Sequence, residues 1–456
     1  MHQIDYNAAK RIVLLIVSIA SFITPFMGSS INIALPSIGN EFSMNTVLLS
    51  WVATSYMLAA AMFLVPFGKM ADIYGRKKFF TYGISIYTIS SLLSAISKSA
   101  LMLICFRIMQ GVGSAMIFAT GTALITLVFP ERERGKALGI NVASVYIGLS
   151  LGPLGGGLLT QHFGWRIIFL INIPFGLIII IVILWKLRGE WEQPRGEKFD
   201  LIGSIIYSFS LVAIMYGFSL LPGRAGIWLI VIGALGICSF IWWGINVEDP
   251  LLNMDLFRDN KVFALSNLAA FINYTATFSV GFILSLYLQY VKVLSPQSTG
   301  LILVSRPIVM AILSPFAGRI SDRIESRILI STGSAFITIG LLLLSFLDEK
   351  SSVEYIIVSL ILLGFGFALF SSPNINAIMS SVDKNFYGIA SSTIGTMRLT
   401  GQMFSMGIAM LIFSIYMGEV QITPESYAHF CDSIGVAFFI FANLCFWGIF
   451  ASFARR

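Results

Sequence analysis

Three arginines fall inside long apolar stretches of the sequence, where a charge has few favourable surroundings. They are Arg107, Arg306 and Arg398. If these stretches cross a membrane, a guanidinium about eight residues inside one of them is expensive to expose to lipid. Arg107 is followed by Gln110 and Gly111 at intervals that place all three residues on one face of a helix. We therefore expect each arginine to face an internal cavity or a hydrogen-bonding partner.

Acidic residues are missing from the interior of the same stretches. All 22 lie in loops or near the ends of the apolar runs. Those nearest to the membrane are Asp72, Asp200, Glu248 and Asp322. An interior with three arginines and no acid should disfavour cationic compounds, unless aromatic faces attract them, and suits neutral or anionic amphiphiles better. Proton-linked chemistry would then be weak, routed through the acids near the membrane, or absent.

The composition restricts the class of protein. Hydrophobic residues make up 57% of the chain, charged residues only 11%, and the mean hydropathy is +0.87, whereas soluble domains are about 25% charged. Only a membrane protein with many spans fits these values. The net charge of +7 does not indicate binding to nucleic acid, because the basic residues collect in alternate loops, as an orientation signal would place them.

The sequence predicts no metal site and no cofactor. The three histidines, His2, His162 and His429, are scattered without ligand spacing. Three of the four cysteines lie in apolar spans, which argues against a disulfide framework. The first apolar run lacks a small-residue cleavage site and continues as a full span, so we expect no cleaved signal peptide.

A membrane-spanning helix needs about 20 apolar residues, and the sequence contains fourteen such runs. They cover residues 12–36, 47–70, 79–97, 99–129, 137–160, 166–187, 200–220, 226–246, 261–291, 296–318, 327–347, 354–380, 388–417 and 433–453. Placing the N-terminus in the cytoplasm puts most of the 29 lysines and arginines in cytoplasmic loops. We therefore expect a protein of the inner (cytoplasmic) membrane with both termini in the cytoplasm.

A charged loop between the second and third spans has a weaker copy 250 residues later. The first copy contains Gly68, Asp72, Gly75 and Arg76, and the second contains Gly318, Asp322 and Arg323. Each copy predicts a tight turn between two spans. Asp72 is expected to cap the third span or to face the positive end of a helix from the other half. Copies eight spans apart indicate two six-helix halves plus two inserted helices.

The expected fold class is an all-α integral membrane protein with fourteen transmembrane helices. Residues 1–187 would form the N-terminal six-helix half. Residues 188–260 would contain the inserted seventh and eighth helices with their flanking loops, and residues 261–456 would form the C-terminal six-helix half.

The fifth span carries a glycine at every fourth position. Gly148, Gly152 and Gly156 give it a flat face for close contact with a neighbouring helix. Pro153 removes one backbone hydrogen bond and permits a bend. A packing seam without further meaning would explain the same pattern.

Together these motifs resemble those of the major facilitator superfamily of secondary transporters. In that family the loop signature of Gly, Asp and Gly-Arg-Lys helps to hold the cytoplasmic side shut, and the resemblance implies this latch here. The Arg-x-x-Gln-Gly run of the fourth helix is implicated in proton transfer. The run that contains Gly152-Pro153 is similar to the antiporter motif of the export branches. The number of spans resembles the fourteen-helix branch of drug:proton antiporters.

The first span departs from the pattern of that branch. Where the branch has Leu-Asp-x-Thr-x-x-Asn-x-Ala-Leu-Pro, this chain has Met27 in place of the acid and Ser29 in place of the threonine, whereas Asn32 and Pro36 match. A carboxylate at that position would be a natural proton carrier. Met27 marks either a lost function or a relocated one.

Candidate residues of a substrate cavity are mostly polar side chains within the predicted spans. They are Met27, Asn32, Tyr56, Tyr146, Asn273, Tyr274, Gln289, Arg306, Asn374, Arg398 and Gln402. For any one of them an ordinary interhelical hydrogen bond is an equally good explanation.

These features predict a secondary active transporter of multidrug-efflux type, linked to the proton gradient, that exports amphipathic organic compounds by rocking of its two halves. Its partners would be small amphipathic substrates, protons and the lipid bilayer. The alternative is a dedicated exporter of an anionic or lipid-like metabolite without proton antiport. An integral-membrane enzyme would need a cluster of His, Asp, Glu or Cys, a channel would need charge rings or a filter loop, and ATP drive would need a nucleotide-binding loop. The sequence contains none of these signatures.

Overall fold

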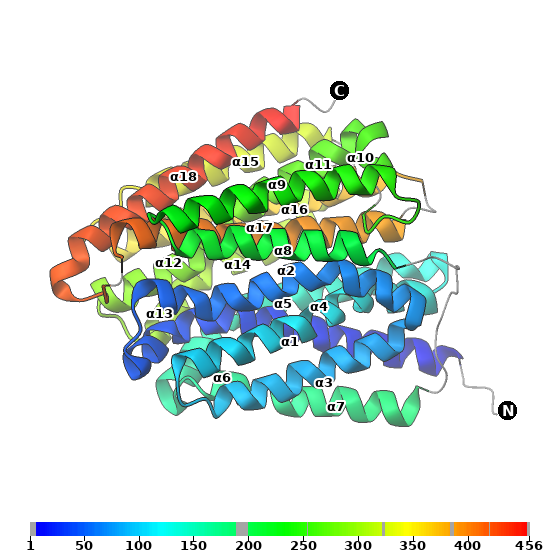
Figure 1. The fold of residues 1–456 in the computed structure, drawn as a ribbon, viewed down its shortest axis with the longest axis horizontal. Helices are drawn as coiled ribbons and strands as arrows, with labels where there is room; N and C mark the ends of the chain where they lie inside the picture. Colours follow the sequence, from blue (N-terminus) through cyan, green and yellow to red (C-terminus); the bar gives the residue numbers. More distant parts are fainter. Residues whose placement is uncertain are drawn as a thin grey trace.

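The computed structural model describes residues 6–187, 199–252, 254–321, 324–383, 387–418 and 420–453. Within these ranges long helices lie side by side along one direction (Figure 1). The first helix begins and the last helix ends toward the same end of the bundle, on the right of Figure 1. We call this the termini end and the opposite one the far end.

The helices of the first part of the chain are α1 (Tyr6–Phe42), α2 (Thr46–Tyr74), α3 (Arg76–Ala95), α4 (Ala100–Val128), α5 (Glu131–Phe163), α6 (Ile167–Leu170) and α7 (Asn172–Lys186). They are followed by α8 (Leu201–Ser219) and α9 (Arg224–Asn246). The remaining helices are α10 (Asp255–Asp259), α11 (Lys261–Thr277), α12 (Val280–Leu286), the π-helix η1 (Tyr287–Val291), α13 (Pro296–Leu303), α14 (Ser305–Ser321), α15 (Ser326–Leu344), α16 (Val353–Ser380), α17 (Tyr387–Tyr416), the short 3₁₀ helix η3 (Pro424–Ser426) and α18 (Tyr427–Phe453).

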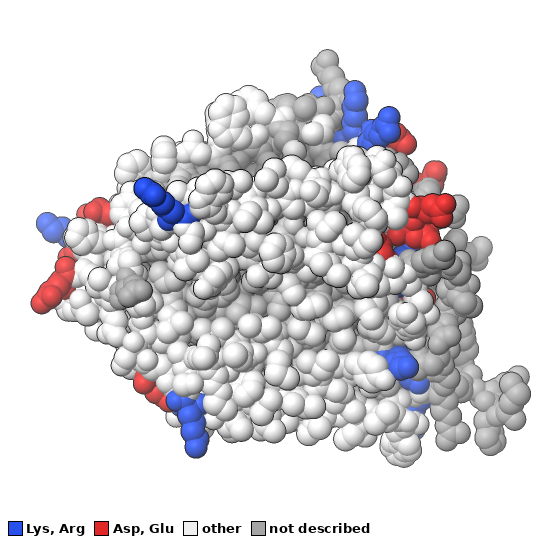
Figure 2. Space-filling model, viewed as in Figure 1, with Lys and Arg blue, Asp and Glu red and all other residues white. Residues whose placement is uncertain are grey.

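Thirteen helical segments in the described ranges are long and apolar enough to cross a membrane. The 20-residue α3 adds a fourteenth, less apolar because it begins with three basic residues and is rich in serine and threonine. Each of the fourteen predicted spans therefore corresponds to a helical segment, and the predicted all-α membrane fold is confirmed. Figure 2 shows charged side chains gathered mainly toward the two ends of one face, with a broad uncharged surface between them. A surface of this kind suits the hydrocarbon core of a bilayer.

The helices pack as two groups with α8 between them. In the first group α1 packs against α5, and α4 packs against both α2 and α3. In the second group α15 packs against α16 and α18, and α11 packs against α17. α8 contacts α2 of the first group and α17 of the second, and α9 covers α8 on the outside (Figure 1). We refer to the two groups as the N-terminal and C-terminal halves.

The sixth predicted span is interrupted at Ile171, between α6 and α7. Two further spans that the sequence predicts as single helices are broken. The ninth consists of α11, α12 and η1, and the tenth consists of α13 and α14. The second break follows from Pro307, because a proline ring opposes the carbonyl four residues earlier, which belongs to Leu303 at the end of α13. At the first break the backbone N–H of Ser279 donates to the hydroxyl of Ser405 on α17 at 2.9 Å. A side chain thus replaces a hydrogen bond of the continuous helix.

Candidate functional site

Arg107 is completely buried between α2, α3 and α4, with an exposed fraction of 0%. Its Nε donates to the carbonyl oxygen of Val52 at 3.0 Å, and a terminal nitrogen donates to Gln110 Oε1 at 2.5 Å. Its guanidinium lies over the ring of Tyr56, 4.4 Å from the centroid. Gln110 donates onward to the hydroxyl of Ser91 at 2.8 Å. These residues form a closed polar network inside the N-terminal half, which we call the Arg107 network.

Tyr56, a predicted cavity residue, belongs to this network instead. Its hydroxyl lies 2.7 Å from that of Ser114, and its side chain is buried. The third predicted residue of the fourth span, Gly111, brings α4 against α2. A Cβ atom at Gly111 would lie 2.4 Å from the carbonyl oxygen of Tyr56, so a larger residue would force the two helices apart.

Met27 also lies inside the N-terminal half rather than in a cavity between the halves. Its side chain is 0% exposed, and Nδ2 of Asn172 on α7 lies 3.5 Å from its sulfur. The same amide nitrogen donates to the carbonyl oxygen of Ile168 at 2.8 Å. The residue at the position of the missing acid is therefore a packed core residue. The sequence offered no signal for its pairing with Asn172.

The glycine face of α5 packs on α1. A Cβ atom at Gly148 would lie 2.4 Å from the carbonyl oxygen of Phe22, and one at Gly156 would lie 2.7 Å from the Cα of Ser30. Gly152, between them, faces the same stretch of α1. These three glycines form a packing seam within the N-terminal half.

A neighbouring face of α5 contacts the C-terminal half. A Cβ atom at Gly300 on α13 would lie 2.3 Å from the carbonyl oxygen of Pro153, and one at Gly157 would lie 2.5 Å from that of Pro296. The two halves thus meet backbone to backbone along α5 and α13, which lies toward the far end in Figure 1.

The last part of α1 contacts the C-terminal half through its backbone carbonyls. Pro36 has no N–H, so the carbonyl of Asn32 one turn earlier lacks its helical partner. The hydroxyl of Ser285 donates to this carbonyl at 2.7 Å. Gln289 Nε2 donates to the carbonyl of Ile33 at 3.0 Å. Asn32 and Gln289, both predicted as cavity residues, therefore help to close the far end.

Two hydrogen bonds between connecting segments complete this closure. Thr46 Oγ1 donates to the carbonyl of Val420 at 3.0 Å, and Gln421 Nε2 donates to that of Ser43 at 2.9 Å. Each bond joins the α1–α2 connection to the segment between α17 and α18. The far end is therefore held shut by several weak polar contacts between the halves.

Nearer the middle of the spans the halves meet through fewer polar contacts. The hydroxyls of Tyr146 on α5 and Ser371 on α16 lie 3.1 Å apart. Ser150 donates to the carbonyl of Pro307 at the longer distance of 3.4 Å. Tyr146 is partly exposed, as are five other predicted cavity residues, one of which is Gln289 at the far end. The remaining set is Tyr146, Tyr274, Arg306, Arg398 and Gln402, and we call it the midspan cluster.

Only some of the hydrogen-bond donors of Arg306 have acceptors in the described chain. One terminal nitrogen donates to the carbonyl of Thr277 at 2.7 Å. This carbonyl belongs to the last residue of α11, at the helix break. Arg306 Nε is buried without a hydrogen-bond partner. The guanidinium lies 5.6 Å from the ring centroid of Phe367.

Arg398 lacks any hydrogen bond or ion pair with the residues that the structure describes. Its contact is with the ring of Phe118 on α4, whose centroid lies 5.5 Å from the guanidinium carbon. Gln402, one turn along α17, likewise forms no side-chain hydrogen bond within the described ranges. Tyr274 lies close enough to Arg398 for their charges to interact. Groups from both halves therefore meet at the midspan cluster.

The other two predicted cavity residues lie inside the C-terminal half. Asn273 and Asn374 are each 2% exposed. Asn374 Nδ2 donates to the carbonyl of Ser266 at 3.1 Å, whereas Oδ1 of Asn273 is buried without a partner. Of the eleven predicted cavity residues, five thus lie in the midspan cluster and six elsewhere.

A family model for the Major Facilitator Superfamily matches residues 17–265 and 267–455. The chain belongs to the Major Facilitator Superfamily. It is accordingly a membrane transporter with many spans.

Several characterised relatives are similar along most of the chain. Riboflavin transporter RibZ of Clostridioides difficile is 31% identical over 447 residues, which cover 96% of each protein. Multidrug resistance protein Stp of Mycobacterium tuberculosis is 31% identical, over 89% of this chain and 76% of that protein. Cephamycin export protein CmcT of Amycolatopsis lactamdurans is 28% identical, over 97% and 93%.

A solved structure supports the fold of this transporter. It is the crystal structure of a bacterial homologue of the human lysosomal transporter Spinster, described as inward-facing and unoccupied. The TM-score is 0.70 at 15% sequence identity, and the match covers 98% of this chain and 97% of the other.

The transporter's first loop signature is a sharp turn between α2 and α3. Gly75 separates the two helices at a φ of 111°, a backbone conformation that residues with a side chain rarely adopt. Asp72 pairs with Arg76, with 2.6 Å between Oδ1 and Nε. No side chain caps α3, so the predicted cap by Asp72 is wrong. A Cβ at Gly68 would lie 3.9 Å from Ala119, an ordinary contact.

The second loop signature is only partly described. Asp322 and Arg323 lie outside the described residues. Gly318 lies on α14, where an added Cβ would meet the hydroxyl of Ser372 at 2.9 Å. In the same turn the hydroxyl of Ser321 accepts a hydrogen bond from Asn376 Nδ2 at 2.9 Å, which ties α14 to α16.

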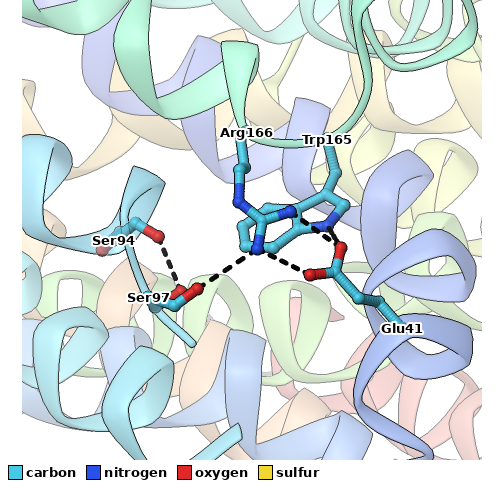
Figure 3. Close-up of polar contacts among 5 residues, drawn as sticks. All are labelled: Glu41, Ser94, Ser97, Trp165 and Arg166. Carbon is cyan, nitrogen blue, oxygen red and sulfur yellow. Dashed lines mark hydrogen bonds and ion pairs between the residues drawn. The ribbon is translucent and has the colours of Figure 1, made fainter. Parts of the chain in front are cut away.

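A polar cluster joins three segments of the N-terminal half (Figure 3). Arg166 donates to both carboxylate oxygens of Glu41, at 2.8 and 2.6 Å, and to the carbonyl of Ser97 at 3.2 Å. Trp165 Nε1 donates to the same carboxylate at 2.7 Å. The hydrogen bonds to Glu41 raise the pKa of the Arg166 guanidinium. The sequence suggested only that Trp165 and Arg166 suit the membrane interface. It gave no signal for Glu41, 125 residues earlier.

Proposed function

We propose that this transporter exports amphipathic organic compounds by alternating access, linked to the proton gradient. One observation carries the proposal: the halves are sealed at the far end, whereas partly exposed polar and aromatic residues of both halves meet at the midspan cluster. Rocking of the halves about this cluster would break the far-end contacts and close the termini end. With both termini in the cytoplasm, the described conformation would take up a substrate from inside the cell.

The relatives support export without identifying a substrate. Two of them are named for multidrug resistance and cephamycin export, and a third for riboflavin transport. α8 and α9 would be the inserted pair of a fourteen-helix branch. The first loop signature, with its Asp72–Arg76 pair, and Gly318 of the second would form the latch at the termini end in the opposite conformation.

For proton coupling the best described candidate is Asp200, at the start of α8. Its side chain is 7% exposed, and Oδ1 accepts hydrogen bonds from the backbone N–H of Gly203 at 2.8 Å and from Trp243 Nε1 at 3.0 Å. Oδ2 is buried and has no partner. This oxygen is therefore a hydrogen-bond acceptor that no donor of the described residues occupies. Because α8 contacts both halves, a charge change there would be felt by both.

The test uses the purified transporter in liposomes that contain a pH-sensitive dye. A pH gradient is imposed, and labelled amphiphiles of negative, neutral and positive charge are added in turn. Substrate-dependent proton flux that Asp200→Asn abolishes would support coupled export. The exposed Asp259→Asn variant, which also loses one carboxylate, should behave like the wild type.

Two outcomes would contradict parts of the proposal. Substrate movement without any proton flux would exclude the coupling. If none of the amphiphiles moves in either direction, the export of amphipathic compounds is wrong.

A further inference from the structure

Arg398 is a charged side chain deep within a span that lacks a polar partner in the described chain. α17 begins at Tyr387, so at 1.5 Å per residue Arg398 lies about 16 Å along the helix. A guanidinium offers five N–H donors in a planar fork, and leaving them unpaired in an apolar region is costly. The partner of Arg398 must therefore come from outside the chain, as water or as a bound compound.

The surroundings of Arg398 are aromatic. Phe118 of the N-terminal half lies 5.5 Å away, and Tyr274 is close enough for an electrostatic interaction. Tyr274 in turn meets Phe367 edge to face, with 5.6 Å between the ring centroids. The guanidinium of Arg306 lies 5.6 Å from the same Phe367 ring. Two aromatic rings of the C-terminal half, Tyr274 and Phe367, thus lie between the two arginines.

Nothing in the contributing helices neutralises these two charges. The sequences of α4, α11, α14 and α17 contain no aspartate or glutamate. The glutamates of the other two helices, α5 and α16, all lie in the first turn, 13 or more residues before Tyr146 and Phe367. Arg306 retains a buried Nε without a partner, so both arginines have donors to spare. The site therefore combines positive charge, unpaired hydrogen-bond donors and the flat faces of aromatic rings. These features suit an anionic ligand.

We propose that the midspan cluster binds planar aromatic compounds that carry a carboxylate, sulfonate or phosphate group. This inference rests on the proposed function and specifies the substrate class of that same site. Arg398 holds the anionic group through its planar fork, and the aromatic part lies against Phe118, Tyr274 and Phe367. Because Phe118 and Arg398 come from opposite halves, the bound compound contacts both parts that must move.

The charge of the compound decides its affinity. An anion gains charge-assisted hydrogen bonds that a neutral compound with the same ring lacks. A cation of the same shape meets two uncompensated positive charges in a region of low dielectric. The expected order of affinity is therefore anion, then neutral compound, then cation.

The experiment measures binding to the purified full-length transporter by equilibrium dialysis with three probes that share a naphthalene ring. They are 2-naphthalenesulfonate, 2-naphthalenemethanol and 2-naphthyltrimethylammonium. We expect the sulfonate to bind at least about tenfold more tightly than the alcohol, and the cation to bind most weakly. Arg398→Gln should weaken sulfonate binding by about tenfold and leave binding of the alcohol unchanged.

Two further variants separate recognition from structure. Arg398→Lys keeps the charge but loses the planar fork, so it should retain part of the sulfonate affinity. Arg224→Gln removes an exposed arginine at the start of α9 and should bind all three probes like the wild type. The wild-type comparison of the three probes tests the proposal even if a variant at position 398 does not fold.

The proposal is overturned if the wild type binds the three probes equally or prefers the cation. It is also overturned if Arg398→Gln weakens the sulfonate and the alcohol to the same extent, since that result indicates a purely structural role. These results are distinct from failure of the export proposal. The export proposal is contradicted if no amphiphile moves across the liposome membrane. The proposal of an anion site alone is contradicted if compounds move irrespective of their charge.

Discussion

Two arginines within the spans of this transporter have opposite surroundings. Arg107 lies inside the N-terminal half, where a carbonyl, an amide and an aromatic ring satisfy it, and its network is sealed from solvent. Arg398 lies between the halves, where its described contact is one aromatic ring. Both residues are single cations on long apolar helices, so the difference does not come from their own chemistry.

The contrast extends to the other polar groups of the two regions. Within the N-terminal half they form multiple bonds among fixed neighbours, as around Arg107 and Arg166. Between the halves they form single bonds, mostly to backbone carbonyls and in one case between two hydroxyls, or none at all. Separate hydrogen bonds of about 1 kcal/mol each can break and re-form when halves move, whereas a buried charged network cannot open without a large loss of stability. Hydrogen bonds between polar groups are thus numerous where the protein is rigid and few where it must rearrange.

The largest expected effect comes from breaking the Arg107 network. Arg107→Ala removes the hydrogen bonds to Gln110 Oε1 and to the carbonyl of Val52 and creates a cavity, so it should reduce the free energy of unfolding by about 3 kcal/mol. Thermal unfolding and the yield of monodisperse protein in detergent would measure this loss. Arg224→Ala, at an exposed arginine, is the control. Equal stability of the two variants would show that the network is not structural.

Pro36→Ala tests whether the contacts between the halves are individually weak. The new N–H would give the carbonyl of Asn32 a helical partner and compete with Ser285. The far end should then open more often, by about 1 kcal/mol or roughly fivefold in population. Spin labels at the exposed Lys98 and Lys350, one in each half, would report the change in distance distribution.

The matched control for this change is Pro25→Ala. Pro25 also lies within α1, but no hydrogen bond described here joins that turn of the helix to the C-terminal half. An identical shift in both variants would attribute the opening to a straighter α1 and not to the bond from Ser285.

A smaller effect is expected at the edge of the N-terminal half. Glu41→Gln removes the charge that faces Arg166 but keeps an acceptor for Trp165. Both partners of this ion pair are 39% exposed, so the loss of unfolding free energy should stay below about 1 kcal/mol and shrink at high salt. Unfolding curves at two salt concentrations, with the exposed Glu425→Gln as control, would show it. A loss as large as that of Arg107→Ala would remove the distinction between sealed and exposed charges.

The smallest effect on stability is expected at Arg398. Arg398→Leu removes a charge without breaking a described hydrogen bond, so the free energy of unfolding should change by less than about 0.5 kcal/mol or increase. Unfolding measured beside Arg107→Ala gives the direct contrast. A loss of several kcal/mol would mean that Arg398 has a structural partner and would contradict the contrast between Arg398 and Arg107.

The sequence predicted some features of the site because they depend on neighbouring residues. The spacing of Arg107, Gln110 and Gly111 placed them on one helical face, and Gly75 marked the turn before α3. Other positions could not be predicted, because a polar residue within a span can face any of several neighbours. Met27 and Tyr56 turned out to face the interior of one half.

The sequence by itself determined the apolar spans and the absence of acids from their interior, since both depend on composition. Only the tertiary structure decided which polar groups found partners. The carbonyl that Pro36 frees is met by Ser285, 253 residues away, and Glu41 is met by Arg166. Arg107 and Arg398 look alike in the chain, but helix packing satisfies one and leaves the other facing the gap between the halves. The physical reason is that hydrogen bonding depends on distance and direction in space, and in a helical bundle these follow from how each helix is rotated against its neighbours.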